Sequence, residues 1–393
     1  MAKEAKPASL MQVTTTARRF VVGCLVFLLL AIVYQVVRDR IVSPGTLTPG
    51  TSDPFLAANN LFGKDLPALS LESLSLAEGS TPEFGVENRF GEFPKNVNVY
   101  KVLKPRERFG TVETGEEVAG RLAFTGPFAK LSETELQWKS ATRTLTFEKV
   151  LKRWKFETNY SSDAKAQATH KINPDKDAYE SGAKTVLSSV GLRIEELERS
   201  NGEVYFMNLE NGQLKEVSSP SSADFAQVQL FWQRVVATPK DKIFVAGTSV
   251  PNETAPIVGN VYRENPVLGS STVILSDAGT SIDNLYAFEL TQWEIDPVSG
   301  VYAIITPEEA WDKVQKGEAF LRQLVRNGKS PLGLYEPLVV KRFVTSNEDV
   351  SIGYFESTNY SEYELPIYVF KGRAELADGG EAEFVFYVDA LKR

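Results

Sequence analysis

The sequence contains very few of the two residue types that most often perform nucleophilic or metal chemistry. Among 393 residues there is one cysteine and one histidine. Cys24 has no second cysteine to pair with, so an intramolecular disulfide is excluded and core packing must hold the fold. A serine–histidine–aspartate triad, or a metal site built on histidine, would have to use His170. Because His170 lies in a polar stretch between predicted elements, the sequence predicts a solvated loop there.

Basic residues are scarcer than acidic ones. The chain has 43 Lys and Arg against 51 Asp and Glu, a net charge of −8. Without residues 1–40, which hold six basic and two acidic residues, 37 basic residues stand against 49 acidic ones and the net charge is −12. A surface of this sign opposes binding to nucleic acid and to anionic lipid headgroups. We therefore expect no nucleic-acid partner.

Long apolar runs are absent except for one, residues 20–37, which read FVVGCLVFLLLAIVYQVV. At about 1.5 Å per residue a helix of this run is just long enough to cross a bilayer core of about 30 Å. Four basic residues precede the run, whereas only Arg38 and Arg40 follow it closely. The positive-inside rule then predicts a cytoplasmic tail at 1–19, a single transmembrane helix at 20–37 and an extracytoplasmic remainder, located at the cell membrane.

Two features of residues 20–37 and their flanks bear on whether this segment is cleaved off after export. Residues 34–38 contain no pattern of small residues of the A-x-A type, which a signal-peptide cleavage site requires. Residues 21–24 resemble a bacterial lipobox, but a lipobox follows the apolar region and this one begins it. The sequence therefore predicts a signal anchor that is retained. An external chain without cysteine is typical of a bacterial cell envelope.

The rest of the chain divides by composition. Residues 38–94 are rich in Pro, Gly, Ser and Thr and predict a flexible linker. Strand and helix patterns follow, and a serine-rich segment at 218–222 predicts a boundary between a first module at 95–218 and a second at 219–393. The sequence predicts an α+β fold with an N-terminal transmembrane helix, a linker and two tandem antiparallel-sheet modules. Each module would pack one or two helices against its sheet.

The individual elements follow from alternation, helical spacing and caps. Residues 227–237 fit a strand but also a helix. A sequence of N-cap, Pro and capping-box Glu at 306–309 predicts a helix, with Trp311 and Leu324 on its buried stripe and its end at Asn327-Gly328. Further helices are predicted at 115–124 and 177–190, and strands at 96–100, 135–138, 144–147, 154–158, 204–209, 242–246, 257–262, 271–275, 286–293, 334–344, 351–356, 365–376 and 381–390.

These patterns permit one comparison with known families. The residues concerned are 116–124, Trp138, Leu145, Trp154 and the helix ending at 190–192 in the first module, and 303–311 at the start of the second. They resemble bacterial membrane-anchored ectodomains with tandem α+β modules of the PepSY type, and more distantly the YycH/YycI regulators, which restrain a cell-wall sensor kinase. The resemblance covers about residues 95–393 and implies a non-catalytic or regulatory extracytoplasmic module.

Several short motifs match catalytic signatures only in part. Ser181 and Lys184 have the S-x-x-K spacing of penicillin-binding enzymes, but the other two elements of that family are missing. Residues 328–330 resemble the end of a phosphate-binding loop, yet Gln323 stands where glycine is required. Residues 173–177 have the oxygen spacing of a calcium loop without its glycine and its final glutamate. A packing face, a helix stop and a helix N-terminus explain the three motifs better.

Carboxylate pairs and aromatic residues are the remaining candidates for catalysis and for ligand binding. Glu308-Glu309 and Glu348-Asp349 fit caps and solvated loops, and a hydrolase would need two carboxylates that converge in space. The five tryptophans would line a sugar or peptide groove only if they were exposed, and their positions in strands and on a helix stripe indicate core. The tryptophans are Trp138, Trp154, Trp232, Trp293 and Trp311.

The sequence therefore predicts no catalytic, cofactor-binding or metal-ligating residue, no cofactor and no enzyme activity. The function it favours is a single-pass anchored extracytoplasmic module that contacts another membrane or envelope protein and regulates it. The partners would be the membrane, through residues 20–37, and that protein. Two alternatives stay open: a domain that binds cell-wall glycan or peptide, and a hydrolase that uses carboxylates.

Overall fold

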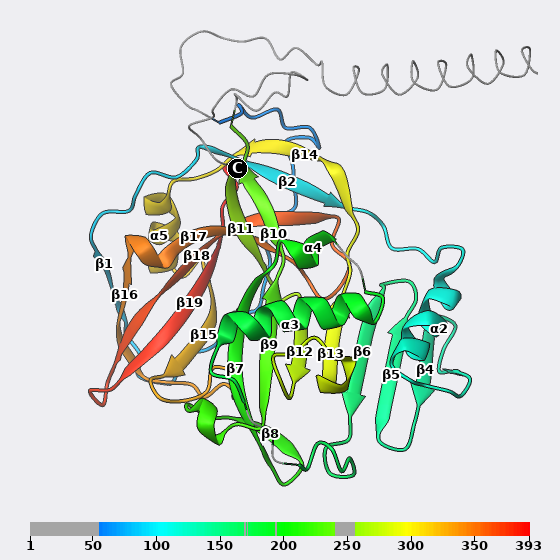
Figure 1. The fold of residues 1–393 in the computed structure, drawn as a ribbon. Coiled ribbons are helices and arrows are strands. Elements are labelled where there is room, and N and C mark those ends of the chain that lie inside the picture. The colour runs from blue at the N-terminus through cyan, green and yellow to red at the C-terminus, as the bar shows by residue number, and fades with distance from the viewer. Residues whose placement is uncertain (1–54, 169, 171, 193–194, 240–255) are drawn as a thin grey trace, which may run out of the picture. The chain divides into compact units, whose positions relative to one another are not determined.

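The computed structural model describes residues 55–168, 170, 172–192, 195–239 and 256–393 (Figure 1). The predicted tail at 1–19, the apolar run at 20–37, the first part of the linker and the strand predicted at 242–246 lie outside these residues. Within the described part of the chain, no helix is both long and apolar enough to cross a membrane. The described residues belong to a single compact unit.

This unit consists mainly of β-strands, so the predicted α+β class is wrong. The described residues form nineteen strands in two sheets, but only four α-helices, of which the longest has 14 residues. The helices are α2 (Thr111–Arg121), α3 (Lys176–Ser189), α4 (Glu195–Glu198) and α5 (Pro307–Gln315). Alternation in the sequence located most strands, but it did not show that so few helices accompany them.

The first sheet has nine strands, and α3 packs against three of them, β7, β9 and β12 (Figure 1). Its order is β3-β4-β5-β6-β13-β12-β9-β7-β8, and the described pairs are antiparallel. The strands are β3 (Ala129–Lys130), β4 (Glu135–Lys139), β5 (Arg143–Glu148), β6 (Arg153–Thr158), β7 (Asn201–Glu210), β8 (Gln213–Glu216), β9 (Phe225–Phe231), β12 (Ser271–Leu275) and β13 (Leu285–Thr291).

The second sheet has ten strands and is built around the long strand β18. In it β18 pairs with β16, β17, β19 and β2, while β15 pairs with β19 and β14 with β2. The strands are β1 (Glu83–Glu87), β2 (Asn96–Val102), β10 (Gln233–Ala237), β11 (Ile257–Tyr262), β14 (Ile295–Ala303), β15 (Phe320–Arg326), β16 (Val340–Ser346), β17 (Val350–Phe355), β18 (Tyr363–Leu376) and β19 (Glu381–Asp389). As predicted, β19 lies inside the sheet and forms a hairpin with β18 across Gly379.

The two sheets do not follow one another along the chain, so the predicted tandem modules are wrong. Strands β12 and β13 come after residue 218, yet they are inserted between β6 and β9 of the first sheet. In the other direction, β2 from the N-terminal half pairs with β14 and β18. The chain passes between the sheets repeatedly: from β2 to β3, from β9 to β10 at Trp232, from β11 to β12 and from β13 to β14. Alternation identifies a strand but says nothing about its partner, which is why the sequence suggested sequential modules.

Residues 55–94, which composition assigned to the linker, lie against the folded unit. Strand β1 pairs in parallel with β16, and Leu66 and Leu69 are buried. The Leu69 backbone N–H donates to Asp389 Oδ2 at 3.0 Å. The segment has little regular structure of its own and is ordered by contacts with residues far away in sequence.

The predicted helix that begins at Pro307 is only half as long as expected. Its start is confirmed, because Thr306 and Glu309 form a capping box. It ends at Gln315, and Gly317 follows with φ +73°. Residues expected in its second half form β15, where a β-bulge lies between Leu321 and Gln323. The bulge lets Leu321 and Leu324 both be buried. Their spacing of three, which is typical of a helix, therefore arises from an irregular strand.

Candidate functional site

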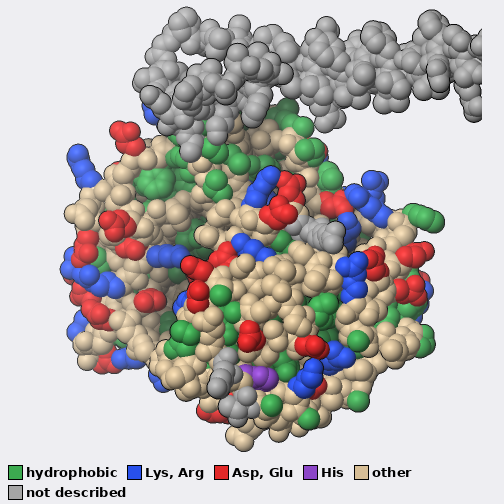
Figure 2. All heavy atoms as spheres, in the orientation of Figure 1, with side chains coloured by type: hydrophobic (Ala, Val, Ile, Leu, Met, Phe, Trp, Pro, Cys, Tyr) green, Lys and Arg blue, Asp and Glu red, His purple; other side chains and the backbone are tan. Residues whose placement is uncertain are grey.

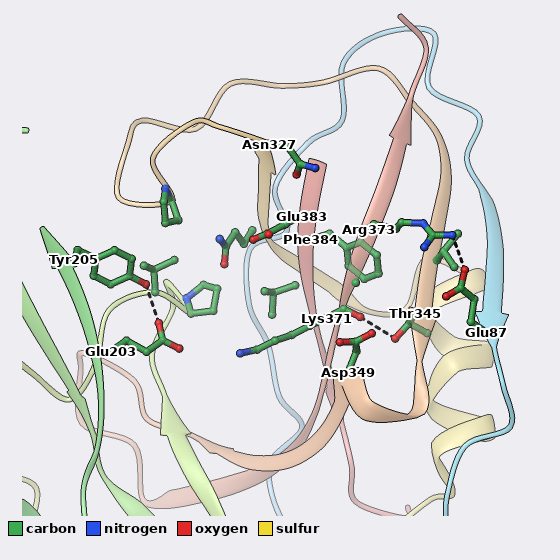
Figure 3. Close-up of a pocket in the computed structure, with 17 residues that line it drawn as sticks. Glu87, Glu203, Tyr205, Asn327, Thr345, Asp349, Lys371, Arg373, Glu383 and Phe384 are labelled. Atoms are coloured by element: carbon green, nitrogen blue, oxygen red, sulfur yellow. Dashed lines mark hydrogen bonds and ion pairs between the residues drawn. The ribbon is translucent and has the colours of Figure 1, made fainter. Parts of the chain in front are cut away.

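Two neighbouring hollows lie where β7 of the first sheet approaches the second sheet. The first hollow has a volume of about 500 Å³, and Figure 3 shows Glu203 and Tyr205 of β7 on one side of it, with Lys371 and Glu383 on the other. Its other lining residues are Glu87, Pro266, Val267, Gln323, Asn327, Pro331, Val344, Thr345, Asp349, Gly372, Arg373, Phe384 and Val385. These residues come from seven separate segments, so no short motif could have revealed the hollow.

The second hollow, of about 540 Å³, follows strand β15 and shares Gln323 and Pro331 with the first. Residues 264–267 connect the two: Glu264 and Asn265 line the second hollow, and Pro266 and Val267 line the first. The remaining lining residues of the second hollow are Leu74, Arg322, Leu324, Val325, Arg326, Lys329, Ser330, Gly333, Leu334, Tyr335, Glu336 and Leu338. We refer to the two hollows together as the groove.

The first hollow contains charges of both signs. The Tyr205 hydroxyl donates to Glu203 Oε2 at 2.8 Å, and burial together with this carboxylate raises the pKa of Tyr205, which therefore remains a hydrogen-bond donor. Arg373 forms an ion pair with Glu87 at 2.5 Å. Lys371 has no ion pair with any described residue and extends across the hollow toward Glu203 (Figure 3). Of the carboxylate pairs considered for hydrolysis, only Asp349 lines the hollow, and it accepts a hydrogen bond from the Ser346 hydroxyl at 2.6 Å.

Two buried ion pairs lie in the second sheet or at the ends of its strands. Arg234 of β10 donates from Nε and Nη2 to the two carboxylate oxygens of Glu364 at 2.8 and 3.0 Å. Arg263, just after β11, faces Glu356, just after β17, at 3.3 Å. Glu364 and Glu356 are almost completely buried. Such charges are stable in the interior only while each is paired, because taking an ion out of water costs several kcal/mol.

Glu356 is the most perturbed carboxyl group of this network. Burial raises its pKa to about 7, the charge of Glu364 adds to the rise, and Arg263 opposes it. Its Oε1 atom has no hydrogen-bond partner among the described residues. Glu356 therefore changes its charge close to neutral pH.

The pair of Arg263 and Glu356 also positions the segment that connects the two hollows. Arg263 Nη2 donates to the carbonyl oxygen of Ser270 at 2.8 Å, which closes the loop 263–270 upon itself. On the side of the first sheet, the Gly269 N–H donates to Gln229 Oε1 at 3.0 Å. The loop that carries residues 264–267 is thus held at both ends by buried polar groups. A change of charge on Glu356 acts directly on this support.

The sequence could have indicated these buried charges, but not their partners. Arg234 and Glu364 are single charges within apolar alternating stretches, FWQRVVA and YELPIYVF. A lone charge in a buried strand requires a partner, yet the two residues are 130 positions apart. The described residues contain no group of three or more His, Cys, Asp or Glu that is arranged to hold a metal ion.

His170 is not in a solvated loop, so that prediction is wrong. Its ring is half-buried, 5.2 Å from the ring of Phe225 and 5.8 Å from that of Tyr286. Its Nε2 atom is buried and has no hydrogen-bond partner among the described residues. The side chain belongs to a small aromatic cluster on the first sheet and lies outside the residues that line the groove.

Ser181 and Lys184 are on α3, and Lys184 is already engaged. Its Nζ atom contacts Glu180 Oε1 at 2.6 Å and the carbonyl oxygen of Ser200 at 2.7 Å. The lysine therefore has a structural partner on each side. Gly182, which follows Ser181, matters for packing, because a Cβ atom on this residue would come within 2.5 Å of the carbonyl oxygen of Ala278.

We expect Gly182→Ala to lower the free energy of unfolding by about 1–3 kcal/mol, the usual cost of overpacking. The sign is informative, because alanine otherwise favours a helix by about 1 kcal/mol over glycine. Urea denaturation followed by tryptophan fluorescence measures the effect. Ser181→Ala, at the exposed neighbouring position, is the control and should change the stability by less than about 0.5 kcal/mol. A more stable Gly182→Ala variant would show that α3 does not approach the backbone at Ala278 closely.

The other motifs also have structural roles. Asp175 is the N-cap of α3 and accepts from the N–H groups of Asp177 and Ala178, at 3.0 and 3.3 Å, which confirms the predicted helix N-terminus. Gly328 has φ +81° and ends strand β15, so the predicted helix stop there is corrected to a strand end. Ser330 donates to Glu216 of the first sheet.

All five tryptophans are buried, as the sequence indicated. Their exposed fractions lie between 2% for Trp232 and 6% for Trp293. Trp154 stacks on Phe147 with the ring centroids 3.7 Å apart. Because none of the tryptophans reaches the surface of the folded unit, they cannot form an aromatic platform for a sugar. The aromatic residues in the groove are Tyr205, Tyr335 and Phe384.

No family model matches the sequence, and no curated protein matches it either. The resemblance to PepSY-type modules and to the YycH/YycI regulators therefore stays a prediction.

Proposed function

We propose that the protein is an extracytoplasmic interaction module, anchored in the cell membrane through residues 20–37, that binds another membrane or envelope protein through the groove. The observation that supports this most is the position of the groove. It lies where the two sheets meet, and it is lined by charged and apolar side chains from both. Figure 2 shows charges of both signs interspersed with apolar side chains over one face of the molecule, a composition suited to a protein partner.

Attachment to the membrane gives the interaction its physical advantage. A binding partner in the same membrane is held close to the groove, so its effective concentration is much higher than in free solution. A modest affinity is then sufficient for regulation. The proposal assigns no chemical reaction to the protein.

Photocrosslinking in living cells tests this function. A photoreactive amino acid is placed at Arg373 in the first hollow, at Lys329 in the second, and at the exposed Lys139 on β4 as a control. We expect mass spectrometry to find one dominant envelope protein at the groove positions and not at Lys139.

Two results would contradict the proposal. One is the absence of any envelope protein at either groove position. The other is unchanged capture when residues 20–37 are deleted, because the anchor would then contribute nothing to the encounter.

A further inference from the structure

Strand β15 has an open edge. On one side it pairs with β19 along its whole length. On the other side its only strand-like contacts are at Leu321, whose carbonyl accepts from Leu74 N–H at 2.9 Å and whose N–H donates to Ser73 Oγ at 3.0 Å. Beyond Leu321, this edge has no strand partner among the described residues. An unpaired edge is a template on which another chain can form backbone hydrogen bonds.

The second hollow runs along this edge. Its lining includes every residue from 322 to 326. Successive side chains of a strand point to opposite faces of the sheet, so a hollow that meets five successive residues must follow the edge and not one face. At about 3.3 Å per residue the open stretch is about 16 Å long. This length suits a short extended peptide.

One wall of the hollow carries apolar side chains, one of them fully exposed. Leu334 has an exposed fraction of 99%, and Tyr335 next to it is held in place by a hydrogen bond from its hydroxyl to the Ser75 carbonyl at 2.6 Å. Leu74 and Leu338 continue this wall. Covering a fully exposed leucine with an apolar side chain of a bound segment removes apolar surface from water, which favours binding.

The charge of the hollow indicates which polar side chain the segment would carry. Lys329 has no ion pair with any described residue, and Arg322 donates only to backbone carbonyl oxygens, those of Glu72 and Glu264. The Glu264 carboxylate accepts from the N–H and hydroxyl of Thr358, at 3.0 and 3.1 Å. Arg326, which also lines the hollow, is paired with Asp378 at 2.7 Å. Lys329 and Arg322 therefore lack a carboxylate partner among the described residues, and a carboxylate on the bound segment would supply one.

We propose that the open edge of β15 binds an extended segment of the partner protein, which adds a strand to the ten-stranded sheet and places an apolar side chain against Leu334 and a carboxylate near Lys329. This inference rests on the proposed function and specifies the surface and the kind of partner. Backbone hydrogen bonds would supply affinity, and the two side chains would supply specificity.

The test uses a phage-displayed library of random linear peptides, enriched on the full-length protein in detergent micelles. We expect the enriched peptides to combine an acidic residue with apolar residues at alternating positions. Two synthetic copies of the best peptide are made, one with N-methyl groups on the odd residues and one with N-methyl groups on the even residues. One of the two should bind at least about tenfold more weakly, because it lacks the N–H donors that pair with β15. Both N-methylation registers are measured.

Two variants of exposed residues locate the contact. Leu334→Asp and Lys329→Glu should each weaken peptide binding about tenfold, whereas Leu131→Asp and Lys139→Glu, exposed residues on the first sheet, should leave it within about twofold. Equal binding by Leu334→Asp, or tolerance of N-methylation in both registers, would overturn the proposal. Crosslinking of the partner at Arg373 but not at Lys329 would overturn it while the proposed function stands. Crosslinking at Lys329 to a second copy of this chain would replace the partner segment with self-association.

Discussion

Replacement of Glu364 by glutamine is expected to lower the free energy of unfolding by about 3–5 kcal/mol. The carboxylate accepts two hydrogen bonds from Arg234 and has an exposed fraction of 1%. Glutamine has a similar size but no charge, so the guanidinium of Arg234, which is 9% exposed, would be left without its partner. The next carboxylate, that of Glu196, is 3.9 Å away. Urea denaturation at neutral pH measures the loss.

A double variant separates the contribution of the ion pair to the free energy of unfolding from the cost of burying one unpaired charge. Combining Arg234→Met with Glu364→Leu removes both charges, and most of the lost stability should return, because a well-packed apolar pair often replaces a buried ion pair at little cost. As a matched control, Glu157→Gln breaks the exposed ion pair with Lys155 and should cost less than about 1 kcal/mol. A loss of similar size in Glu157→Gln and Glu364→Gln would show that the interior pair is not desolvated.

The second large effect is a dependence of stability on pH that arises from Glu356. Its pKa is about 7 in the folded protein against a reference value of 4.5. Between these values the folded state keeps a proton that the unfolded chain has released, so this group stabilises the fold fully below pH 4.5. The contribution is lost as the pH rises to 7, by about 3 kcal/mol in total.

Glu356→Gln isolates this contribution from that of the other carboxyl groups. The amide remains neutral at every pH, so the difference in unfolding free energy between the wild type and the variant should change by about 3 kcal/mol between pH 4.5 and pH 8. The change should favour the wild type at the acidic end. A difference that stays constant over this range would show that Glu356 keeps one charge state throughout.

The titration of Glu356 bears on the groove through the loop 263–270. Above the pKa, the ionised carboxylate attracts Arg263, which also holds the Ser270 carbonyl. Below it, this attraction is lost. Residues 264–267 of the loop line both hollows, so Arg263, the partner of Glu356, lies next in sequence to the segment that the two hollows share.

Local structure was largely accessible from the sequence. The alternation in residues 96–100 and 144–147 correctly predicted β2 and β5, and Asp175 and Gly191 correctly marked the ends of α3. The sequence was misleading where a β-bulge gave a strand the spacing of buried residues that is typical of a helix. The bulge in β15 produced helical spacing between Leu321 and Leu324, and no local signal distinguishes the two.

The sequence by itself determined the positions of most strands, the caps of the helices, the burial of the tryptophans and the absence of disulfides, because these depend on periodicity and composition. Only the tertiary structure decided the order of the strands, the docking of residues 55–94, the buried pairs Arg234–Glu364 and Arg263–Glu356, and the groove. Each of these depends on residues that are distant in the chain and are brought together by strand pairing. Alternation specifies which side of a strand is buried, but not which strand lies beside it.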